Sequence, residues 1–303
     1  MQQVPDAAPL RILILGATGM LGSCLFRAFS DDDRYLTFGT IRAATDVHLF
    51  RPDLRDALIP DVQVDGEAGL IRAMTHARPD VVINCIGIIK QLPSANDHLA
   101  SLAINASLPH RLARFCELAG ARLVHFSTDC VFSGKLGGYR EDDFADAYDV
   151  YGRTKLLGEV TYDHAITLRT SIIGHELTCA RSLIDWFLSQ KGRTNGFARA
   201  VFSGLPTIEI ARVLKHYVLN DPKLSGLYHL SVDPINKYDL LHHVARIYGM
   251  NIELARDDSL VIDRSLNSER FRAATGYAPS PWTDLITAMH QDYLQVWRPG
   301  MQE

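Results

Sequence analysis

Hydrophobic residues in the first part of the chain gather in short blocks that end at glycine or polar residues. The clearest blocks lie at 10–15, 81–86, 123–127 and 166–173. Short apolar runs bounded by turn residues are typical of strands that are buried on both faces of a parallel sheet. Longer segments with helical spacing separate the blocks, and in 99–119 the apolar positions expected on one side are Leu102, Leu108, Leu112, Phe115 and Leu118. This alternation predicts an α/β fold with a doubly wound parallel sheet, a Rossmann domain, over residues 1–175.

The pattern changes in the last third of the chain. Helices are expected at 182–190, 208–219 and 238–248, and a strand is expected at 227–230. The segment 192–206 between the first two helices is broken by glycine and proline. We expect residues 176–303 to form a smaller substrate-binding lobe over the binding edge of the sheet. The pattern leaves room for some strands and helices of this lobe to return to the Rossmann domain.

Composition narrows the classes of function. The chain has 303 residues, 47% of them hydrophobic and 22% charged, as in an ordinary globular protein of one large or two modest domains. A net charge of −4 gives no overall electrostatic reason to bind nucleic acid or an anionic membrane. The five cysteines include no C-x-x-C pair, so neither a disulfide framework nor a metal site is expected. Without a signal-peptide pattern or an apolar run of about 20 residues, the expected location is the cytoplasm.

A glycine-rich loop follows the first apolar block. Its sequence, G-A-T-G-M-L-G, predicts a strand, a tight turn and a helix that opens near Met20. Glycines let the backbone approach a pyrophosphate, which then lies at the positive end of the helix. The alternative is a turn that only packs strand against helix. The residues expected to contact a dinucleotide are Gly16, Thr18, Gly19, Met20, Leu21 and Gly22.

The residues after the second and third strands bear on the choice of cofactor. The second strand has no acidic residue at its end, where an acid would bind the ribose hydroxyls of NAD. Arg42 stands there instead, and its planar cation suits the 2′-phosphate of NADP, unless it is an ordinary solvated arginine. A third strand is expected to end after V-Q-V at Asp65, which would either reach the adenine or serve as a turn residue. The pattern favours NADPH, with NADH as the other option.

Tyr151 and Lys155 are spaced four residues apart in Y-G-R-T-K, so they share one face of a helix. A tyrosine has a pKa of about 10, and a neighbouring cation lowers that pKa. Thr128 lies in S-T-D-C-V-F-S-G at the end of an apolar strand, where such sheets bind their ligands. A tyrosine tuned in this way can protonate a carbonyl oxygen that the threonine orients, while the lysine also holds the nicotinamide ribose.

Together these motifs resemble the extended short-chain dehydrogenase/reductases, and above all the dTDP-4-dehydrorhamnose reductase family. The resemblance rests on G-A-T-G-M-L-G, S-T-D-x-V-F-x-G and Y-G-x-T-K-L-x-G-E, and continues through L-R-T-S (168–171), G-L-P-T (204–207), G-L-Y-H-L (226–230) and D-R-S-L-N (263–267). It covers nearly the whole chain. It implies an NADPH-dependent reductase that delivers hydride to C4 of a nucleotide-linked 4-keto-6-deoxysugar. Tyr151 would be the proton donor, Thr128 the carbonyl anchor and Lys155 the ribose holder.

The resemblance implies further site residues. Asn105 in L-A-I-N-A-S-L matches an asparagine that supports the lysine through a water or backbone link. Asn84, Cys85 and Gly87 match the segment along the ribose–phosphate path of the cofactor. The residues expected to contact the substrate are Thr128, Asp129, Cys130, His175, Arg199, Thr207, Arg264 and Trp282.

Cys130 departs from the family pattern, in which tyrosine is usual at this place. The pair Asp129-Cys130 also lacks the glutamate that nucleotide-sugar dehydratases carry, which argues against dehydration. GDP-fucose synthase has a cysteine at the matching position and uses it as a base, with a histidine as the partner acid. His175 and His229 are the candidates for that acid here. The first rival hypothesis is therefore an epimerase or epimerase–reductase that uses Cys130, unless this cysteine is only a small buried hydrophobe.

A binding protein is the second alternative. The regulatory subunit of methionine adenosyltransferase resembles the same reductase branch and binds NADP without needing turnover. Thr128, Tyr151 and Lys155 are all present in this chain, which favours an enzyme. The nucleotide base, the sugar and a homodimeric state stay open at this point.

Overall fold

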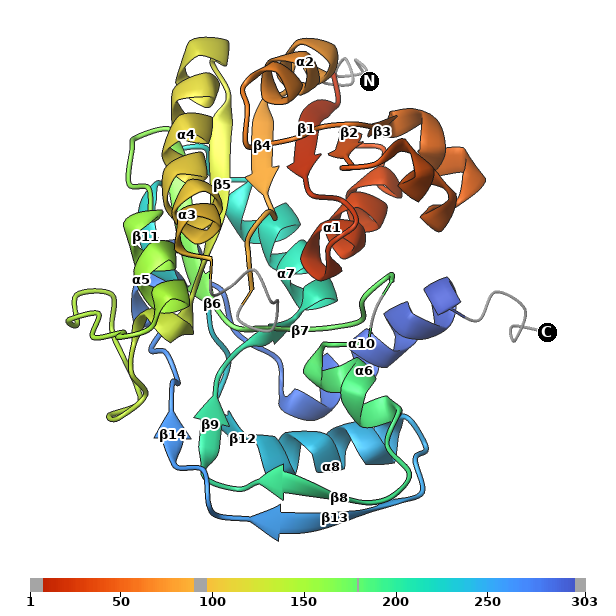
Figure 1. The fold of residues 1–303 in the computed structure, drawn as a ribbon, viewed down its shortest axis with the longest axis vertical. Coiled ribbons are helices and arrows are strands. Elements are labelled where there is room, and N and C mark those ends of the chain that lie inside the picture. Colours follow the sequence, from red (N-terminus) through yellow and green to blue (C-terminus); the bar gives the residue numbers. More distant parts are fainter. Residues whose placement is uncertain (1–7, 90–96, 179, 298–303) are drawn as a thin grey trace, which may run out of the picture.

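The computed structural model describes residues 8–89, 97–178 and 180–297. Its main layer is a seven-stranded sheet of order β11-β6-β5-β4-β1-β2-β3, in which every neighbouring pair is parallel (Figure 1). The strands are β1 (Leu10–Leu15), β2 (Tyr35–Thr40), β3 (Leu58–Ile59), β4 (Val81–Asn84), β5 (Arg122–Thr128), β6 (Ala165–Thr170) and β11 (Gly226–His229). The predicted doubly wound α/β fold is confirmed.

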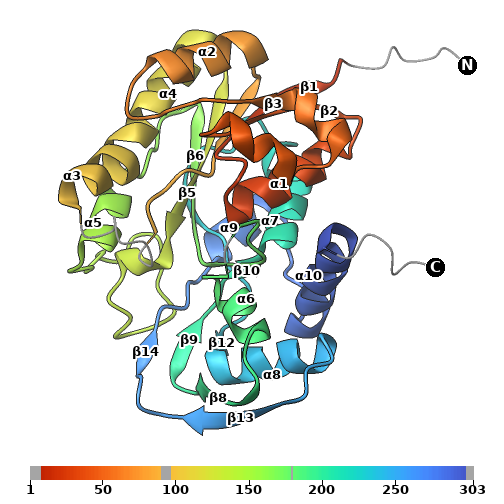
Figure 2. The same ribbon diagram turned by 45° about the vertical axis from the view of Figure 1, so that its right-hand side comes forward.

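Helices cover both faces of this sheet (Figure 2). Alternate residues of β1 enter different cores, with Ile12 and Ile14 on one face and Leu13 and Leu15 on the other. The helices on the first face are α1 (Met20–Ser30), α7 (Thr207–Val213) and part of α10 (Trp282–Trp297). The helices on the second face are α2 (Ala68–Ala77) and α4 (Leu108–Ala119), with α5 (Val150–Leu157) beside them.

The helix expected over 99–119 is present but is not uniform. It consists of α3 (His98–Ser101), the π-helical η4 (Leu102–Ser107) and α4. Leu108 and Leu112 are buried, but Leu102 and Leu118 are 44% and 85% exposed, so the expectation that all five apolar positions share one side was wrong. The buried side of α4 centres on Leu112 and Cys116, and the wider turn of η4 shifts the register of the residues before it.

The third strand lies earlier than the sequence pattern predicted. Two short 3₁₀ helices, η1 (Ala44–Leu49) and η2 (Pro52–Ala57), lead into β3, which ends at Ile59. Pro60 follows at once, and Asp61 has a left-handed φ of 55°, so the chain turns away there. The V-Q-V segment at 62–64 is therefore not a strand.

The smaller lobe is built from short sheets and the remaining helices. Its strand pairs are β8 (Gly192–Phe197) with β13 (Ile252–Asp257), β9 (Ala200–Phe202) with both β12 (Ile235–Asn236) and β14 (Ile262–Asp263), and β7 (Ile172–Ile173) with β10 (Leu205–Pro206). Its helices are α6 (Leu183–Leu188) and α8 (Lys237–Ile247), whereas η6 (Leu214–Val218) continues α7 beside the main sheet and α9 (Glu269–Thr275) packs next to β11. The expected helices are present, whereas the glycine-broken stretch 192–206 forms three strands that the sequence pattern did not predict.

Segments after residue 175 contribute to both parts of the molecule. The strand expected at 227–230 is present as β11, which pairs with β6 in the main sheet, and α7 packs against α1. Arg27 of α1 forms an ion pair with Asp292 of α10 at 3.0 Å, so the last helix is held to the first. Within the described residues, no helix combines the length and hydrophobicity needed to cross a membrane.

Candidate active site

The loop between β1 and α1 leaves a helix N-terminus open for an anion. Gly16 has a φ of +80°, and a Cβ on Gly22 would lie 2.1 Å from the Gly16 carbonyl oxygen, so neither position accommodates a side chain. The N-cap of α1 is Gly19, and neither a capping side chain nor an acidic residue in the first turn occupies its N–H groups. Thr18 is half-buried in this turn, and Leu21 packs into the core. The geometry fits the pyrophosphate of a dinucleotide, which supports the predicted contacts of this loop.

Arg42 and Asp65, the two residues expected to bear on cofactor choice, both lie at the surface. Arg42 is exposed just beyond the end of β2, and its carbonyl oxygen accepts a hydrogen bond from Gln63. Across the described part of the chain no side chain pairs with the Arg42 guanidinium, so it is available to a phosphate. Asp65 lies in a bend before α2, where its carboxylate accepts a hydrogen bond from the Gly66 backbone at 2.9 Å. The expectation that Asp65 ends the third strand was wrong because β3 stops at Ile59.

The segment after β4 packs against the glycine loop. A Cβ on Gly16 would lie 3.6 Å from the Cys85 carbonyl group, and Gly87 follows in the same segment. Asn84 is buried, and its amide nitrogen lies 3.2 Å from Nδ1 of His125. Burial raises the pKa of the Cys85 thiol. The Asn84 side chain is thus engaged inside the protein, while the backbone of this segment borders the expected cofactor path.

Asn105 joins the loop after β4 to α5. It lies in η4, where its side-chain oxygen accepts from the Ile88 backbone N–H at 2.9 Å and its nitrogen donates to the Ile88 carbonyl at 3.0 Å. The same nitrogen is 3.5 Å from Oγ1 of Thr154 in α5. A Cβ on Gly158 would lie 2.0 Å from the Asn105 carbonyl oxygen, so this glycine allows α5 to approach η4. The expected link from Asn105 to Lys155 stays a prediction.

Thr128 and Tyr151 meet because α5 begins directly against the end of β5. Asp149 caps α5 by accepting a hydrogen bond from the Gly152 backbone N–H at 2.9 Å. A Cβ on Gly152 would lie 2.3 Å from the Cys130 carbonyl oxygen, so this approach requires glycine. Oγ1 of Thr128 accepts from the Cys130 backbone N–H at 3.1 Å, and Thr128 and Tyr151 line one cavity.

Desolvation favours the neutral forms of Tyr151 and Lys155, so it raises the pKa of the tyrosine and lowers that of the lysine. Burial in the cavity wall raises the pKa of the Tyr151 phenol, although a hydrogen bond with Thr128 acts in the other direction. Burial lowers the pKa of Lys155 to about 8, with the Glu159 carboxylate opposing the shift. The Lys155 ammonium donates to the Phe126 carbonyl oxygen at 2.6 Å. The expectation that Lys155 lowers the pKa of Tyr151 was therefore wrong for this structure: burial is the largest cause of the rise, and the charges of Cys130, Asp129 and Asp149 act in the same direction.

Cys130 and Asp129 lie together on the cavity wall. Burial and the Asp129 carboxylate raise the pKa of the Cys130 thiol to about 12, so this group is a neutral thiol at neutral pH. Burial also raises the pKa of Asp129. One Asp129 oxygen accepts a hydrogen bond from the Ser171 hydroxyl at 2.6 Å.

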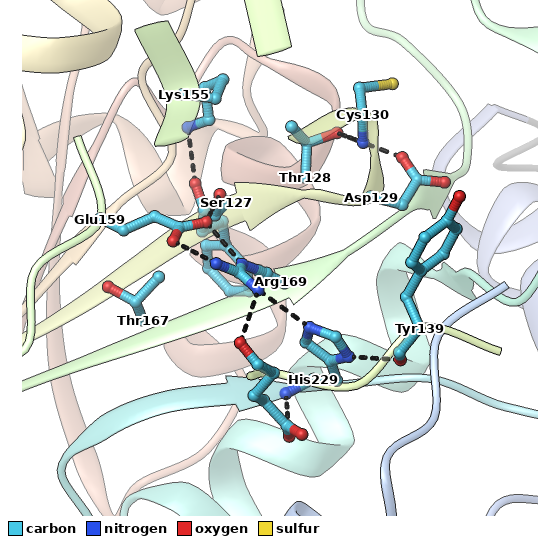
Figure 3. Close-up of polar contacts among 12 residues, drawn as sticks. Ser127, Thr128, Asp129, Cys130, Tyr139, Lys155, Glu159, Thr167, Arg169 and His229 are labelled. Atoms are coloured by element: carbon cyan, nitrogen blue, oxygen red, sulfur yellow. Dashed lines mark hydrogen bonds and ion pairs between the residues drawn. The ribbon is translucent and has the colours of Figure 1, made fainter. Parts of the chain in front are cut away.

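His229 belongs to a buried network with Arg169 and Tyr139 (Figure 3). Its Nδ1 lies 3.0 Å from the Tyr139 carbonyl oxygen, so Nδ1 carries the proton. Its Nε2 therefore accepts from the Arg169 guanidinium, at 3.3 Å. Burial and Arg169 lower the pKa of His229 to about 4, so this histidine is neutral at neutral pH.

A cavity of about 470 Å³ opens at the carboxyl end of β5, between the main sheet and the smaller lobe. The predicted site residues that line it are Met20, Thr128, Asp129, Cys130, Tyr151 and Arg264. The polar and charged lining residues that sequence reasoning missed are Ser127, Thr170, Ser171, Glu176, Arg181, Ser182 and Lys237. The structure thus brings the expected catalytic pair together with charged residues of the lobe.

His175 does not line the cavity. Its Nδ1 lies 2.6 Å from the Asp185 carboxylate, and its Nε2 lies 2.8 Å from the Tyr248 hydroxyl. Both ring nitrogens are therefore engaged between α6 and α8. The expected substrate contact at this position has no support from the geometry.

Three other residues expected at the substrate also lie away from the cavity. Arg199 is exposed in the turn between β8 and β9. Thr207 begins α7 and packs against Gly174, where an added Cβ would lie 2.7 Å from its Oγ1. Trp282 is buried, and its indole nitrogen donates to the Asp233 carbonyl oxygen at 2.8 Å. None of these three side chains lines the cavity.

Comparison with known sequences identifies relatives along most of the chain. The family model described as "RmlD substrate binding domain" matches residues 10–294. A dTDP-4-dehydrorhamnose reductase of Mycobacterium tuberculosis H37Rv is 33% identical over 170 residues, which cover 53% of this chain and 49% of that protein. This chain therefore spans about half the length of the curated reductases that it matches. Methionine adenosyltransferase 2 subunit beta of Xenopus tropicalis is 28% identical over 264 residues, which cover 79% of this chain and 72% of that protein.

Solved structures share the fold over nearly the whole chain. One is dTDP-4-dehydrorhamnose reductase from Bacillus anthracis in complex with NADP, with a TM-score of 0.76, 18% identity and coverage of 95% of this chain and 99% of that chain. Another is the Bordetella bronchiseptica enzyme WbmG in complex with NAD and UDP, with a TM-score of 0.74, 20% identity and coverage of 96% of each chain. At these identities the likeness shows the fold.

Proposed function

Because this chain belongs to the RmlD substrate binding domain family, we propose that it is an NADPH-dependent reductase of a nucleotide-linked 4-keto-6-deoxysugar. The observation that carries the proposal is the cavity in which Thr128 and Tyr151 lie at the end of β5. Met20, from the first turn after the glycine loop, lines the same cavity, so the expected dinucleotide site and a substrate would adjoin.

Reduction of a ketone requires a hydride donor for the carbonyl carbon and a proton donor for the carbonyl oxygen. Bound NADPH would supply the hydride, which leaves the carbonyl oxygen in need of a proton. Tyr151 carries its phenolic proton at neutral pH, and it can donate that proton as negative charge develops on the oxygen, because the developing alkoxide is a stronger base than the phenolate. The Thr128 hydroxyl, fixed by the Cys130 backbone N–H, can orient the same oxygen.

Cations on the cavity wall support an anionic substrate. Arg181, Lys237 and Arg264 line the cavity, and none of them forms an ion pair with a carboxylate of the described residues. Arg264 is held in place by donating to the Phe132 carbonyl oxygen at 2.9 Å. A nucleoside diphosphate offers the charge and the paired oxygens that arginine binds well. We propose that the nucleotide portion of the substrate lies along these three side chains.

The rival hypothesis, an epimerase with Cys130 as base, gains no support from the site. A thiolate is needed to remove a proton from a carbon beside the ketone, but the pKa of this thiol is raised to about 12. The two histidines considered as partner acids, His175 and His229, do not line the cavity. A reductase needs neither group.

A cofactor-binding subunit without turnover is the second candidate. It is favoured by one observation: the relatives named methionine adenosyltransferase 2 subunit beta match 79% of this chain, whereas the Mycobacterium reductase matches 53%. The presence of Thr128 and Tyr151 on one cavity wall, with Lys155 four residues after Tyr151, supports the reductase.

The test is to mix the protein with NADPH and a panel of dTDP-, GDP- and UDP-4-keto-6-deoxysugars, and to follow NADPH absorbance. We expect oxidation with one nucleotide class and its loss in Tyr151→Phe. Tight NADPH binding without oxidation of any panel member would refute the reductase and favour the subunit.

The epimerase is tested separately by solvent deuterium exchange at the carbons beside the ketone. We expect Cys130→Ser to keep reduction and to leave exchange at its background level. Enzyme-dependent exchange that disappears in Cys130→Ser would establish the epimerase instead.

A further inference from the structure

Glu159 and Arg169 form an ion pair in the interior behind the catalytic residues (Figure 3). The guanidinium Nε and Nη2 donate to the two carboxylate oxygens, each at 2.7 Å, and the Arg169 and Glu159 side chains are 4% and 7% exposed. Neither residue lines the cavity, and the proposed proton transfer uses neither. A buried pair of this kind seldom stabilises a fold more than apolar residues of the same size would. Its position therefore suggests a role at the site.

The pair is attached to the last residues of β5. The Ser127 hydroxyl, one residue before Thr128, donates to Oε1 of Glu159 at 2.6 Å. The carbonyl oxygen of Phe126 accepts from the Lys155 ammonium at 2.6 Å. Lys155 lies in the last turn of α5, and Glu159 follows the C-cap of that helix. Both contacts between the end of β5 and the end of α5 are thus made by charged side chains.

The same arginine also contacts β11 and the segment around Glu141. Its Nη1 lies 3.3 Å from the Glu141 carbonyl oxygen and 3.3 Å from Nε2 of His229. His229 binds the Tyr139 carbonyl oxygen, which also accepts from the Asn267 backbone N–H at 2.7 Å. The segment that carries Arg264 is therefore connected to the end of β5 through this network.

We propose that Glu159, held by Arg169, is a positioning residue that fixes the end of β5 against α5 and supplies the counter-charge for the buried Lys155 ammonium. The effect on turnover rests on the proposed reductase function, whereas the effect on Lys155 belongs to the protein alone.

The charges around Lys155 support this role. Burial lowers the pKa of Lys155 to about 8, and Glu159 is the group that opposes the shift. The other titratable neighbours are His125 in β5, whose pKa is lowered well below its ordinary value, and Tyr151 on the same helix, whose pKa is raised. Both are neutral at pH 7, and the Arg169 charge is not among the causes of the Lys155 shift. Without the carboxylate, the pKa of Lys155 would fall further, and the lysine would lose its proton near neutral pH.

The direct test is an NMR titration of lysine side chains labelled with ¹³C at the ε position. The chain has seven lysines, so the spectrum is simple, and Lys155→Arg identifies the Lys155 signal. We expect a titration midpoint of about 8 in the wild type and a decrease of about one pH unit or more in Glu159→Gln. Glu159→Asp, which keeps the charge, should leave the midpoint close to the wild-type value.

Two further variants keep the test decisive. Glu159→Gln leaves the Arg169 charge buried without a partner, which can unfold the protein, so Glu159→Gln/Arg169→Gln removes both charges. The double variant should also lower the midpoint. Glu117→Gln removes an exposed carboxylate that pairs with Arg114 at the surface, and it should leave the midpoint unchanged. An unchanged midpoint in a folded Glu159→Gln or double variant would overturn the proposal.

Turnover is measured separately, as the pH profile of kcat/KM. We expect the alkaline limb to move to lower pH in Glu159→Gln by the same amount as the NMR midpoint. A wild type that reduces no 4-keto sugar, together with a lowered NMR midpoint in the variant, would refute the reductase and leave the role of Glu159 standing. A loss of kcat with no movement of the limb or the midpoint would show that Glu159 is only structural.

Discussion

Replacing Gly152 with alanine tests whether the approach of α5 to β5 creates the catalytic geometry. The added Cβ would lie 2.3 Å from the Cys130 carbonyl oxygen and 2.6 Å from the Ala147 Cβ, whereas ordinary contacts begin near 3.4 Å. The start of α5 must therefore move by about 1 Å, and Tyr151 next to it must move as well. Alanine in a helix normally gains about 1 kcal/mol over glycine, but overpacking of this kind costs about 1–3 kcal/mol.

The expected outcome is a fall in kcat of about 100-fold with only a modest loss of stability, because a displacement of about 1 Å is large for proton transfer and small for the fold. Initial rates of NADPH oxidation and a thermal melt measure the two effects. Gly66→Ala is the matched control, since its Cβ would have no atom within 4 Å, and it should change neither quantity. A Gly152→Ala protein that keeps kcat within about threefold of the wild type would refute this reasoning.

Three further substitutions test the cofactor site and the buried charges. Arg42→Ala should raise the Kd for NADPH by about tenfold or more and leave that for NADH nearly unchanged, as measured by fluorescence titration; equal effects on both cofactors would contradict a 2′-phosphate contact. Lys155→Met should abolish turnover and raise the Tm at pH 7, because the wild-type fold buries an ammonium whose pKa is lowered to about 8. A lower Tm would show that burial of this ammonium does not destabilise the fold. The pKa of His229 is lowered from 6.5 to about 4, so the unfolded chain binds the proton first, and this residue reduces the free energy of unfolding as pH falls from 6.5 toward 4. Urea titrations at pH 7 and pH 5.5 measure how much unfolding free energy is lost between the two pH values. That loss should be about 1 kcal/mol smaller in His229→Asn than in the wild type, and an equal loss would contradict the neutral state of His229.

The sequence was sufficient to predict the meeting of Thr128 and Tyr151, because a general rule governs it. Parallel strands present their carboxyl ends at one edge of the sheet, and the polar residue that ends β5 must lie there. The same rule could have identified Ser171, which directly follows β6 and binds Asp129 in the cavity. The glycine loop was predictable because its constraints are local: they depend on backbone conformation over a few residues.

The lobe could not be predicted residue by residue, because its contacts join distant parts of the chain. His175 follows β7 closely, as a substrate contact would, yet its partner Tyr248 lies at the end of α8. Thr207 likewise faces Gly174 instead of the cavity. Lys237, which does line the cavity, stands at the start of α8 and has no motif to distinguish it from a surface lysine. Such placements depend on how short strands pair, and the sequence pattern of 192–206 gave no sign of those strands.

The return of β11 to the main sheet limits how proteins of this architecture can be recombined. Gly226–His229 form the outer neighbour of β6, and α7 covers α1 from the same half of the chain. A chimera that joined residues 1–175 to a foreign C-terminal half would have to match this strand edge as well as the cavity. Where the match failed, β6 would present an unpaired edge, which invites pairing with other chains. An exchange of substrate preference between relatives therefore needs one crossover before α7 and another after β11. The segment between the two crossovers then stays with its own sheet.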